Sequence, residues 1–233
     1  MTRLQVEVWS DIACPWCYIG KRRLEAALAE FEHAGEVDVV WRAFELDPSL
    51  PKVAPDATPF LERLAKKLRS TPAQAQVMIE RVVSTAAKDG LELRFDQLQQ
   101  SNTFDGHRVI HLAGAHGLRD AMKERMLRGY LSEGEAIGDP AVLERLAVEV
   151  GLDRVEVRSM LASDRFTAEV RAEEREAREL GISGVPFFVI NRKIGVSGAQ
   201  PAEVLRGALT QGWNQTMGDQ PAAGAGCGPD GCD

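Results

Sequence analysis

Residues 4–17 read LQVEVWSDIACPWC and place two cysteines directly behind an alternating apolar segment. The alternation in residues 4–9 predicts a β-strand. Pro15 suits the first position of a helix, where its missing N–H costs no hydrogen bond, so Cys14 falls at the N-cap. Apolar residues recur at helical spacing after Cys17, which predicts that the helix continues; they are Leu24, Ala27, Leu28 and Phe31. The sequence therefore predicts a cysteine pair at a strand-to-helix turn.

The elements expected after this turn follow an order that predicts the fold class. A second strand is expected over residues 37–44, and residues 56–180 carry only helical patterns. Residues 185–191 and 193–196 then predict a β-hairpin before a last helix over 201–212. This order predicts an α/β protein with a thioredoxin-like fold and an inserted all-helical domain. Three parts are expected: a discontinuous thioredoxin-like domain (1–55 and 180–216), the insertion (56–179) and a flexible tail rich in Gly, Ala and Pro (217–233).

Two helix starts within the insertion are predicted from local chemistry. Thr71, Pro72 and Gln74 match a capping box with proline at the first helical position. Asp139 followed by Pro140 marks a second start, because an aspartate at the N-cap accepts hydrogen bonds from free backbone N–H groups.

Composition excludes several classes of protein. The 233 residues are 44% hydrophobic and 27% charged, which excludes a disordered, collagen-like or coiled-coil chain. The net charge of −7 excludes a non-specific nucleic-acid binder, which needs a positive field. The longest apolar run, around 185–190, is far shorter than the ~20 residues of a membrane span. Glu7 lies where a signal peptide would need its apolar core, so we expect a cytoplasmic protein without membrane or nucleic-acid partners.

The C-x-x-C sequence formed by Cys14 and Cys17 predicts redox chemistry. A thiolate at a helix N-terminus is stabilised by the macrodipole and by unpaired N–H groups, so the pKa of Cys14 is expected below its usual ~8.5 while that of Cys17 is not. Cys14 would be the nucleophile, and Cys17, one turn inside, would resolve a mixed disulfide. Half of a zinc site, or two merely buried residues, are the alternatives.

Four stretches resemble the DsbA family of thiol–disulfide oxidoreductases, in its FrnE-like branch. They are residues 10–20, residues 44–48, the segment Asn102-Thr103 with His107-Arg108, and residues 181–188. The resemblance implies disulfide exchange with thiol- or disulfide-containing proteins, with glutathione as a further partner and no cofactor or metal. The direction of electron flow stays open. The 2-hydroxychromene-2-carboxylate isomerases and kappa-class glutathione transferases share this architecture but typically carry serine at the position of Cys14, so a glutathione-dependent isomerase or transferase is an alternative.

The resemblance also implies roles for residues outside the cysteine pair. Val185-Pro186 would be a cis-proline loop that packs against the pair and offers the Val185 backbone to a substrate, with a strand-edge proline as the alternative. Trp16 and His107 would lie on the substrate side. His107 and His111 share a helix face and could hold zinc, but a hydrogen-bonding face or a cleft wall is favoured over metal.

Cys227 and Cys232 form a C-x4-C pair near the end of the chain. The four residues between them, Gly-Pro-Asp-Gly, favour a turn that brings the sulfurs together. The intervening flexible chain from Trp213 spans roughly 20 Å, so the pair could reach Cys14. We expect a second redox pair, since such a pair also occurs in FrnE-like proteins. Inert tail cysteines and a metal-binding module that uses all four cysteines are the alternatives.

Overall fold

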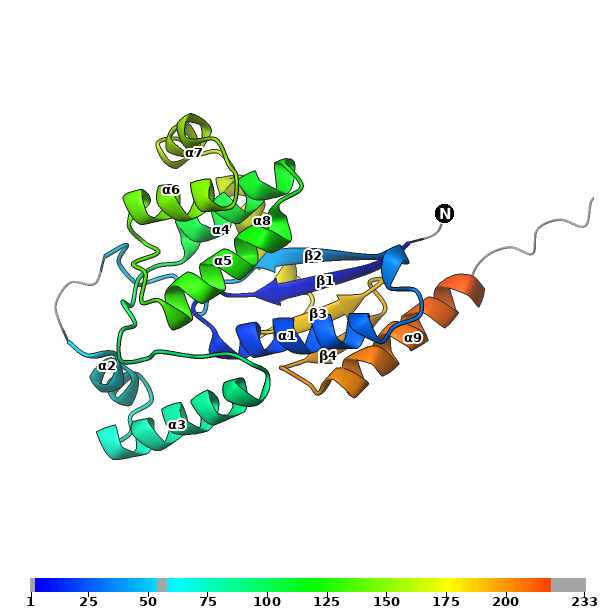
Figure 1. Cartoon of the computed structure of the whole chain (residues 1–233), viewed down its shortest axis with the longest axis horizontal. Coiled ribbons are helices and arrows are strands. Elements are labelled where there is room, and N and C mark those ends of the chain that lie inside the picture. The colour runs from blue at the N-terminus through cyan, green and yellow to red at the C-terminus, as the bar shows by residue number, and fades with distance from the viewer. Residues whose placement is uncertain (1–2, 54–57, 219–233) are drawn as a thin grey trace, which may run out of the picture.

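A four-stranded sheet forms the centre of the computed structural model, which describes residues 3–53 and 58–218 (Figure 1). The strand order is β2-β1-β3-β4; β1 pairs in parallel with β2 and antiparallel with β3, and β3 pairs antiparallel with β4. The strands are β1 (Leu4–Ser10), β2 (Val37–Ala43), β3 (Phe187–Ile190) and β4 (Ile194–Ser197). Because β1 is hydrogen-bonded on both sides, the turn that follows it leaves from the middle of the sheet.

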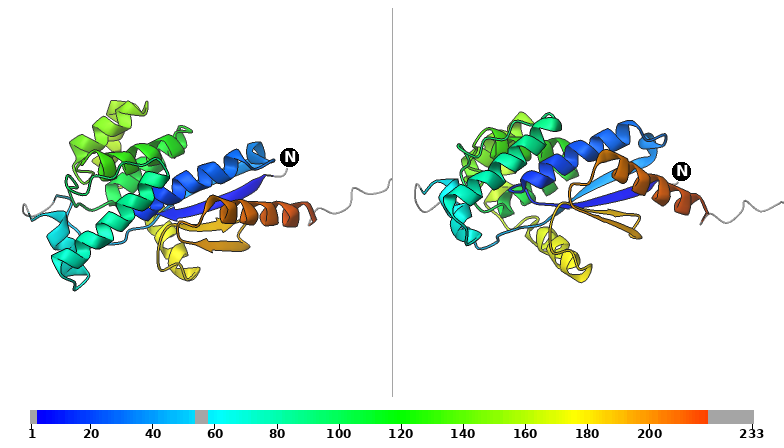
Figure 2. Two further views of the ribbon diagram at one scale, coloured as in Figure 1. Left: turned by 60° about the horizontal axis from the view of Figure 1, so that its bottom comes forward. Right: turned by 90° about the horizontal axis from the view of Figure 1, so that it is seen from below.

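Helices cover both faces of this sheet (Figure 2). α1 (Pro15–Ala29) and α9 (Ala202–Gly218) pack together on one face, in a core that contains Leu4, Val6 and Val8 of β1. α8 (Thr167–Glu179) packs against the other face, where Ala177 joins Trp9 and Val189. The alternation in β1 therefore sends successive side chains to opposite layers.

The remaining helices lie between β2 and β3 in the sequence, as predicted. They are α2 (Phe60–Lys67), α3 (Pro72–Lys88), α4 (Phe104–Ala115), α5 (Arg119–Ser132), α6 (Pro140–Glu149) and α7 (Arg154–Leu161). The predicted capping box is confirmed, since Thr71 and Gln74 bond reciprocally, and Asp139 caps α6. The α/β fold class, thioredoxin-like with helices inserted, is confirmed; the division into separate domains stays a prediction.

The largest buried cluster joins the start of α1 to the inserted helices. Cys14 and Cys17 belong to it, together with Leu112 of α4 and Met126 of α5. The first turn of α1 is therefore enclosed by helices from the insertion, while the rest of α1 packs on the sheet.

The last helix is longer than predicted. We expected it to end near Gly212, but α9 continues to Gly218, where Trp213 stacks on His33 and Thr216 accepts a hydrogen bond from Asn191 after β3. The last two helical residues thus come from the predicted tail. No helix within the described ranges is both long and apolar enough to cross a bilayer.

Two glycines of α9 provide a matched test of this packing. A Cβ at Gly212 would lie 2.6 Å from Cγ2 of Ile190, whereas a Cβ at Gly207 would have no neighbour within 4 Å. Gly212→Ala should therefore lower the free energy of unfolding by about 1–3 kcal/mol through overpacking. Gly207→Ala should raise it by about 0.5–1 kcal/mol, because alanine is the better helix former. Urea denaturation measures both; equal effects would contradict the packing of α9 on β3.

Candidate active site

The Asp11 carboxylate organises the turn between β1 and α1. Its Oδ2 accepts a hydrogen bond of 2.7 Å from the backbone N–H of Leu46, and its Oδ1 accepts one of 3.3 Å from the N–H of Ala13. The Asp11 carbonyl also accepts from the N–H of Cys14 at 3.3 Å. The side chain is buried, and these bonds tie the turn to the segment that follows β2.

Cys14 is the N-cap of α1 with Pro15 at the first helical position, as predicted. The backbone N–H of Cys17 donates to the Cys14 carbonyl at 3.0 Å, which closes the first turn. Both cysteines are free thiols, with exposures of 4% for Cys14 and 1% for Cys17. Both residues are therefore buried, with Cys14 at the helix start as the outer member of the pair and Cys17 one turn inside as the inner one. Trp16 between them is 38% exposed, so the motif presents its indole to solvent.

The Val185-Pro186 segment lies against Cys14, as predicted, and its peptide bond is cis. The Cys14 thiol donates to the Val185 carbonyl at 3.5 Å. Gly20 of α1 permits this approach, because a Cβ there would lie 2.9 Å from Cγ of Pro186. The cysteine motif and the proline segment, far apart in the sequence, therefore meet at one point.

Lys123 of α5 is a part of this site that the sequence analysis missed. Its side chain is 1% exposed, and its Nζ donates to the Ser10 carbonyl at 3.1 Å, beside the Trp41 ring. Burial lowers the pKa of Lys123 to about 8, against the opposing effect of the negative charge on the nearby Cys17 thiolate. Lys123 shares one apolar stripe of α5 with Met126 and Leu127, and a lysine in such a stripe was the available signal.

The two thiols have pKa shifts opposite to the sequence expectation. The pKa of Cys14 is raised well above its usual value. The main cause is the hydrogen bond between Cys14 and Cys17, and burial of the thiol is the second. Burial also acts to raise the pKa of Cys17, but the hydrogen bond from Cys14 and the charge of Lys123 outweigh it, so the pKa of Cys17 is lowered. The expectation of a low pKa at Cys14 alone is therefore wrong. Both sulfurs lie at the same helix terminus, whereas the charge of Lys123 favours the thiolate of Cys17, and the hydrogen bond between the sulfurs then favours the protonated form of Cys14.

His107 of α4 lies behind the turn rather than at its mouth. Its Nε2 is 3.5 Å from Oδ1 of Asp11 and has no hydrogen-bond partner among the described residues. Burial lowers the pKa of His107, while the adjacent ring helps to lower the pKa of Asp11 against the effect of burial. In this structure His107 supports the turn, and its place on the substrate side stays a prediction.

His111, one turn further along α4, does not join His107 in a metal site. Its Nε2 lies 3.0 Å from Oε2 of Glu173 on α8, which agrees with the hydrogen-bonding face favoured from the sequence. Within residues 3–53 and 58–218, no group of three His, Cys, Asp or Glu side chains is arranged to hold a metal ion.

A charged cluster fixes the segment next to the Asp11 contact. Arg171 of α8 donates to Glu45 at 2.5 Å and to Glu174 at 2.7 Å, and Asn102 donates to Glu45 at 3.0 Å. Burial and the neighbouring Glu174 raise the pKa of Glu45 to about 7. Glu45 and Asn102 come from two stretches on which the family resemblance was based, and the structure shows that they bond to each other one residue from Leu46.

Comparisons with known proteins agree with this geometry. The model of the DSBA-like thioredoxin domain family matches residues 5–210. A probable DsbA oxidoreductase, SCO1869 from Streptomyces coelicolor, is 46% identical, with 99% of both chains covered and a TM-score of 0.86. The uncharacterized protein YwbO from Bacillus subtilis is 27% identical over 89% of this chain and 96% of its own. The cytosolic disulfide reductase DsbM from Pseudomonas aeruginosa, solved with GSH, shares the fold at 20% identity, with a TM-score of 0.62 over 90% of this chain and 99% of its own.

Substitution of Lys123 tests whether its charge lowers the pKa of Cys17. Lys123→Met should raise the midpoint of Cys17 alkylation by about 1 pH unit, because a cation at this range favours the thiolate. Peptide mass spectrometry after alkylation across a pH series measures each sulfur separately. Lys21→Met is the control, since Lys21 is also buried beside Trp41 but pairs with Glu25 and Asp120. Equal midpoints in the two variants would refute the role of Lys123.

Proposed function

Because the chain belongs to the DSBA-like thioredoxin domain family, we propose that it exchanges disulfides with cysteines of protein substrates through Cys14 and Cys17. The observation that carries this proposal is the contact of the Cys14 thiol with the Val185 carbonyl, in front of an inner thiol that faces a buried lysine. Two sulfurs with opposite pKa shifts suit a nucleophile and a resolving group, which a purely structural pair does not need.

The first step joins Cys14 to the substrate. Cys14 attacks one sulfur of a substrate disulfide while its proton turns from the Val185 carbonyl to the adjacent Cys17 thiolate and is taken up there. An S–S bond forms between Cys14 and the substrate, the substrate S–S bond breaks, and the second substrate sulfur leaves as a thiolate that takes a proton from water. Burial of both sulfurs limits competing reactions with small oxidants.

The second step releases the substrate. Cys17 loses its proton again, which the Lys123 charge favours, and attacks the Cys14 sulfur. The Cys14–Cys17 disulfide forms and the remaining substrate sulfur leaves as a thiolate. The protein has then lost two electrons and the substrate has gained two. The reverse sequence oxidises a substrate dithiol, and the potentials of the partners set the direction.

The substrate-binding roles of Trp16, Val185 and Pro186 belong to the same proposal. The Val185 carbonyl is an acceptor that an extended substrate chain can reach, and the exposed indole of Trp16 offers an apolar contact beside the reacting sulfur. Glutathione is proposed as a small thiol partner and the cytoplasm as the location. Both are supported by the fold shared with the cytosolic reductase solved with GSH. A serine-based isomerase is not favoured, because both thiols are present and face one another.

Single substitutions of the two cysteines test the exchange mechanism. Cys14→Ser should lower the rate of insulin disulfide reduction by at least about 100-fold, since a thiolate rather than a hydroxyl is the nucleophile. Cys17→Ser should instead accumulate a mixed disulfide between Cys14 and the substrate, visible on non-reducing gels. Retained activity in Cys14→Ser, or a disulfide trapped at another cysteine, would overturn the assignment.

Cys227 and Cys232 lie outside the described residues, and we propose that they form a second redox pair that exchanges with Cys14. The turn-forming sequence between them supports their pairing. Replacement of both by serine should slow turnover with protein disulfides about tenfold, if the pair acts at the millimolar effective concentration of a short tether. In a Cys17→Ser background, a disulfide between Cys14 and the tail should be trappable. Unchanged turnover without a trapped species would show that the tail takes no part.

A further inference from the structure

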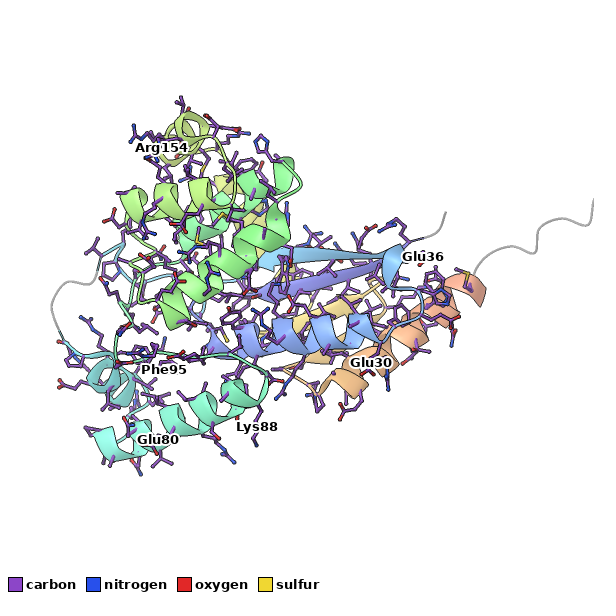
Figure 3. The ribbon with its side chains drawn as sticks, in the orientation of Figure 1. Glu30, Glu36, Glu80, Lys88, Phe95 and Arg154 are labelled. Atoms are coloured by element: carbon purple, nitrogen blue, oxygen red, sulfur yellow. The ribbon has the colours of Figure 1, made fainter. Side chains whose placement is uncertain are left out.

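Two buried glutamates face a single cation between α8 and the segment after β2. Nη1 of Arg171 donates to Oε2 of Glu45 at 2.5 Å and to Oε2 of Glu174 at 2.7 Å. The side chains of these glutamates are only 2% and 10% exposed, whereas exposed glutamates such as Glu30 and Glu80 lie at the periphery of the molecule (Figure 3). A buried carboxylate is costly unless its charge is compensated, and one guanidinium can balance only one of the two.

The other described groups in contact with this cluster are uncharged. The carboxamide of Asn102, from the segment before α4, donates to Oε1 of Glu45 at 3.0 Å, and Cζ of Arg171 lies 4.1 Å from the centroid of the Phe104 ring of α4. Oε1 of Glu174 is buried and has no hydrogen-bond partner among the described residues. A proton held between the two carboxyls would remove the excess charge and bring a donor to this group.

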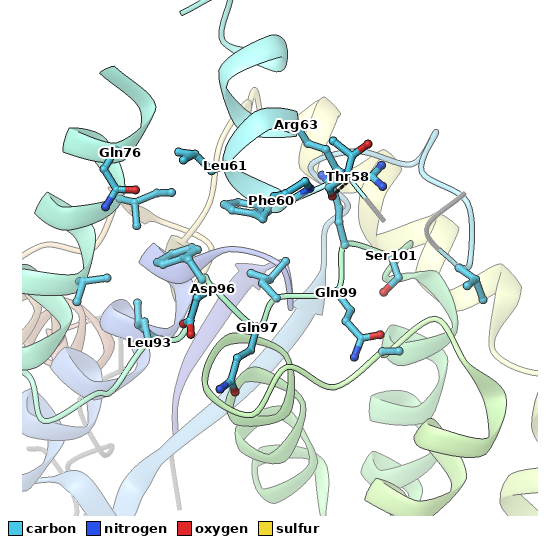
Figure 4. A pocket seen from close by; sticks show the side chains of 18 of the residues that line it. Thr58, Phe60, Leu61, Arg63, Gln76, Leu93, Asp96, Gln97, Gln99 and Ser101 are labelled. Atoms are coloured by element: carbon cyan, nitrogen blue, oxygen red, sulfur yellow. Dashed lines mark hydrogen bonds between the residues drawn. The ribbon is translucent and has the colours of Figure 1, made fainter. Parts of the chain in front are cut away.

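Asn102 separates the cluster from the large pocket of the inserted helices. Ser101 lines that pocket, which has a volume of about 870 Å³ (Figure 4). The side chain of the next residue, Asn102, instead donates to Glu45 and, at 3.4 Å, to the Pro48 carbonyl. The cluster is therefore distinct from the pocket, and it holds residues 45–48 in place.

α8 holds the segment after β2 at two points, and only one of them can titrate near neutral pH. Oε2 of Glu173 accepts from the backbone N–H of Ala43 at 2.7 Å. Burial acts to raise the pKa of Glu173, but the contact with His111 outweighs it, so this pKa is lowered to about 2. The contact at Ala43 therefore stays the same across the neutral range, whereas the contact at Glu45 changes with its proton.

Glu45 is joined to the cysteine turn through the next residue. The N–H of Leu46 donates to Oδ2 of Asp11 at 2.7 Å. Burial acts to raise the pKa of Asp11, and the His107 ring and the Leu46 N–H lower it. The Asp11 charge also raises the pKa of Cys14, after the larger effects of the hydrogen bond to the second thiol and of burial. If the segment moved away from α8, the Asp11 charge would be less compensated and Cys14 would ionise less readily.

From these contacts we propose that Glu45 and Glu174 share one proton and that this proton positions Leu46 against Asp11. Glu174 is then a positioning residue for the exchange reaction at Cys14. The inference rests on the proposed function and adds control by pH to it. When the proton is lost, the two carboxylates repel each other, the segment after β2 moves away from α8, and Cys14 reacts more slowly than it would with the segment in place.

Glu174→Gln tests the positioning, because an amide is a permanent donor to Glu45 and removes one charge. The probe is iodoacetamide, a neutral alkylating agent, and peptide mass spectrometry follows Cys14 at about pH 6 and about pH 8.5. The ratio of the two rates, high pH over low, should be about threefold larger in Glu174→Gln than in the unmodified protein, as for a difference of about half a unit in the pKa of Cys14. Glu45→Gln should have the same effect. Glu169→Gln, at an exposed position of the same helix, should keep the unmodified ratio.

Carboxyl titration provides a second measurement. In protein labelled with ¹³C at the glutamate carboxyls, NMR should show a transition near pH 7 that is absent from Glu45→Gln and Glu174→Gln but present in Glu169→Gln. Equal rate ratios in all these proteins, or a transition near pH 7 that survives in Glu174→Gln, would overturn the inference. If both measurements agree with it but the reduced protein does not exchange with insulin, the proposed function fails and the shared proton is retained.

Discussion

The buried carboxylate of Asp11 is the contact on which the site depends. It accepts hydrogen bonds from the backbone N–H groups of Ala13 and Leu46, and each bond is partly shielded from water. It thereby holds the end of β1, the segment after β2 and the His107 ring of α4 in one arrangement. Because Cys14 begins α1 three residues later, the position of its sulfur follows from this one side chain.

The inserted helices contribute residues to the active site as well as packing against the sheet. The sheet supplies the turn, and the chain entering β3 supplies the carbonyl that faces Cys14, but the cation that favours an ionised Cys17 comes from α5. The Val185 carbonyl accepts a hydrogen bond from the Cys14 thiol, whereas the Lys123 cation lies near Cys17. The two cysteines therefore differ in how readily each one ionises. A helix N-terminus alone would give both sulfurs the same preference, and their order of ionisation would then be undetermined.

Much of this could be predicted from local sequence, because the relevant interactions lie within a few residues of each other. The Cys14 N-cap, the capping box at Thr71 and the start of α6 at Asp139 are such cases. The contact of Val185-Pro186 with Cys14 needed the family resemblance. Lys123 was missed and the pKa order was wrong, because both depend on a helix more than 100 residues away, whose packing no local pattern encodes. The length of α9 was underestimated for the same reason, since its last turns are supported by the sheet.

The position of β1 between β2 and β3 also affects how the chain folds. β1 can pair with β2 soon after synthesis, but its other edge stays open until the whole helical insertion has been made and β3 follows. Such non-local pairing slows folding, because a long loop must close first. The inserted helices share a buried cluster with the start of α1, so their packing on α1 shortens the loop that must close before β3 can pair. Until then Cys14 lacks its carbonyl partner, so a nascent chain carries the cysteine motif before it carries a complete site.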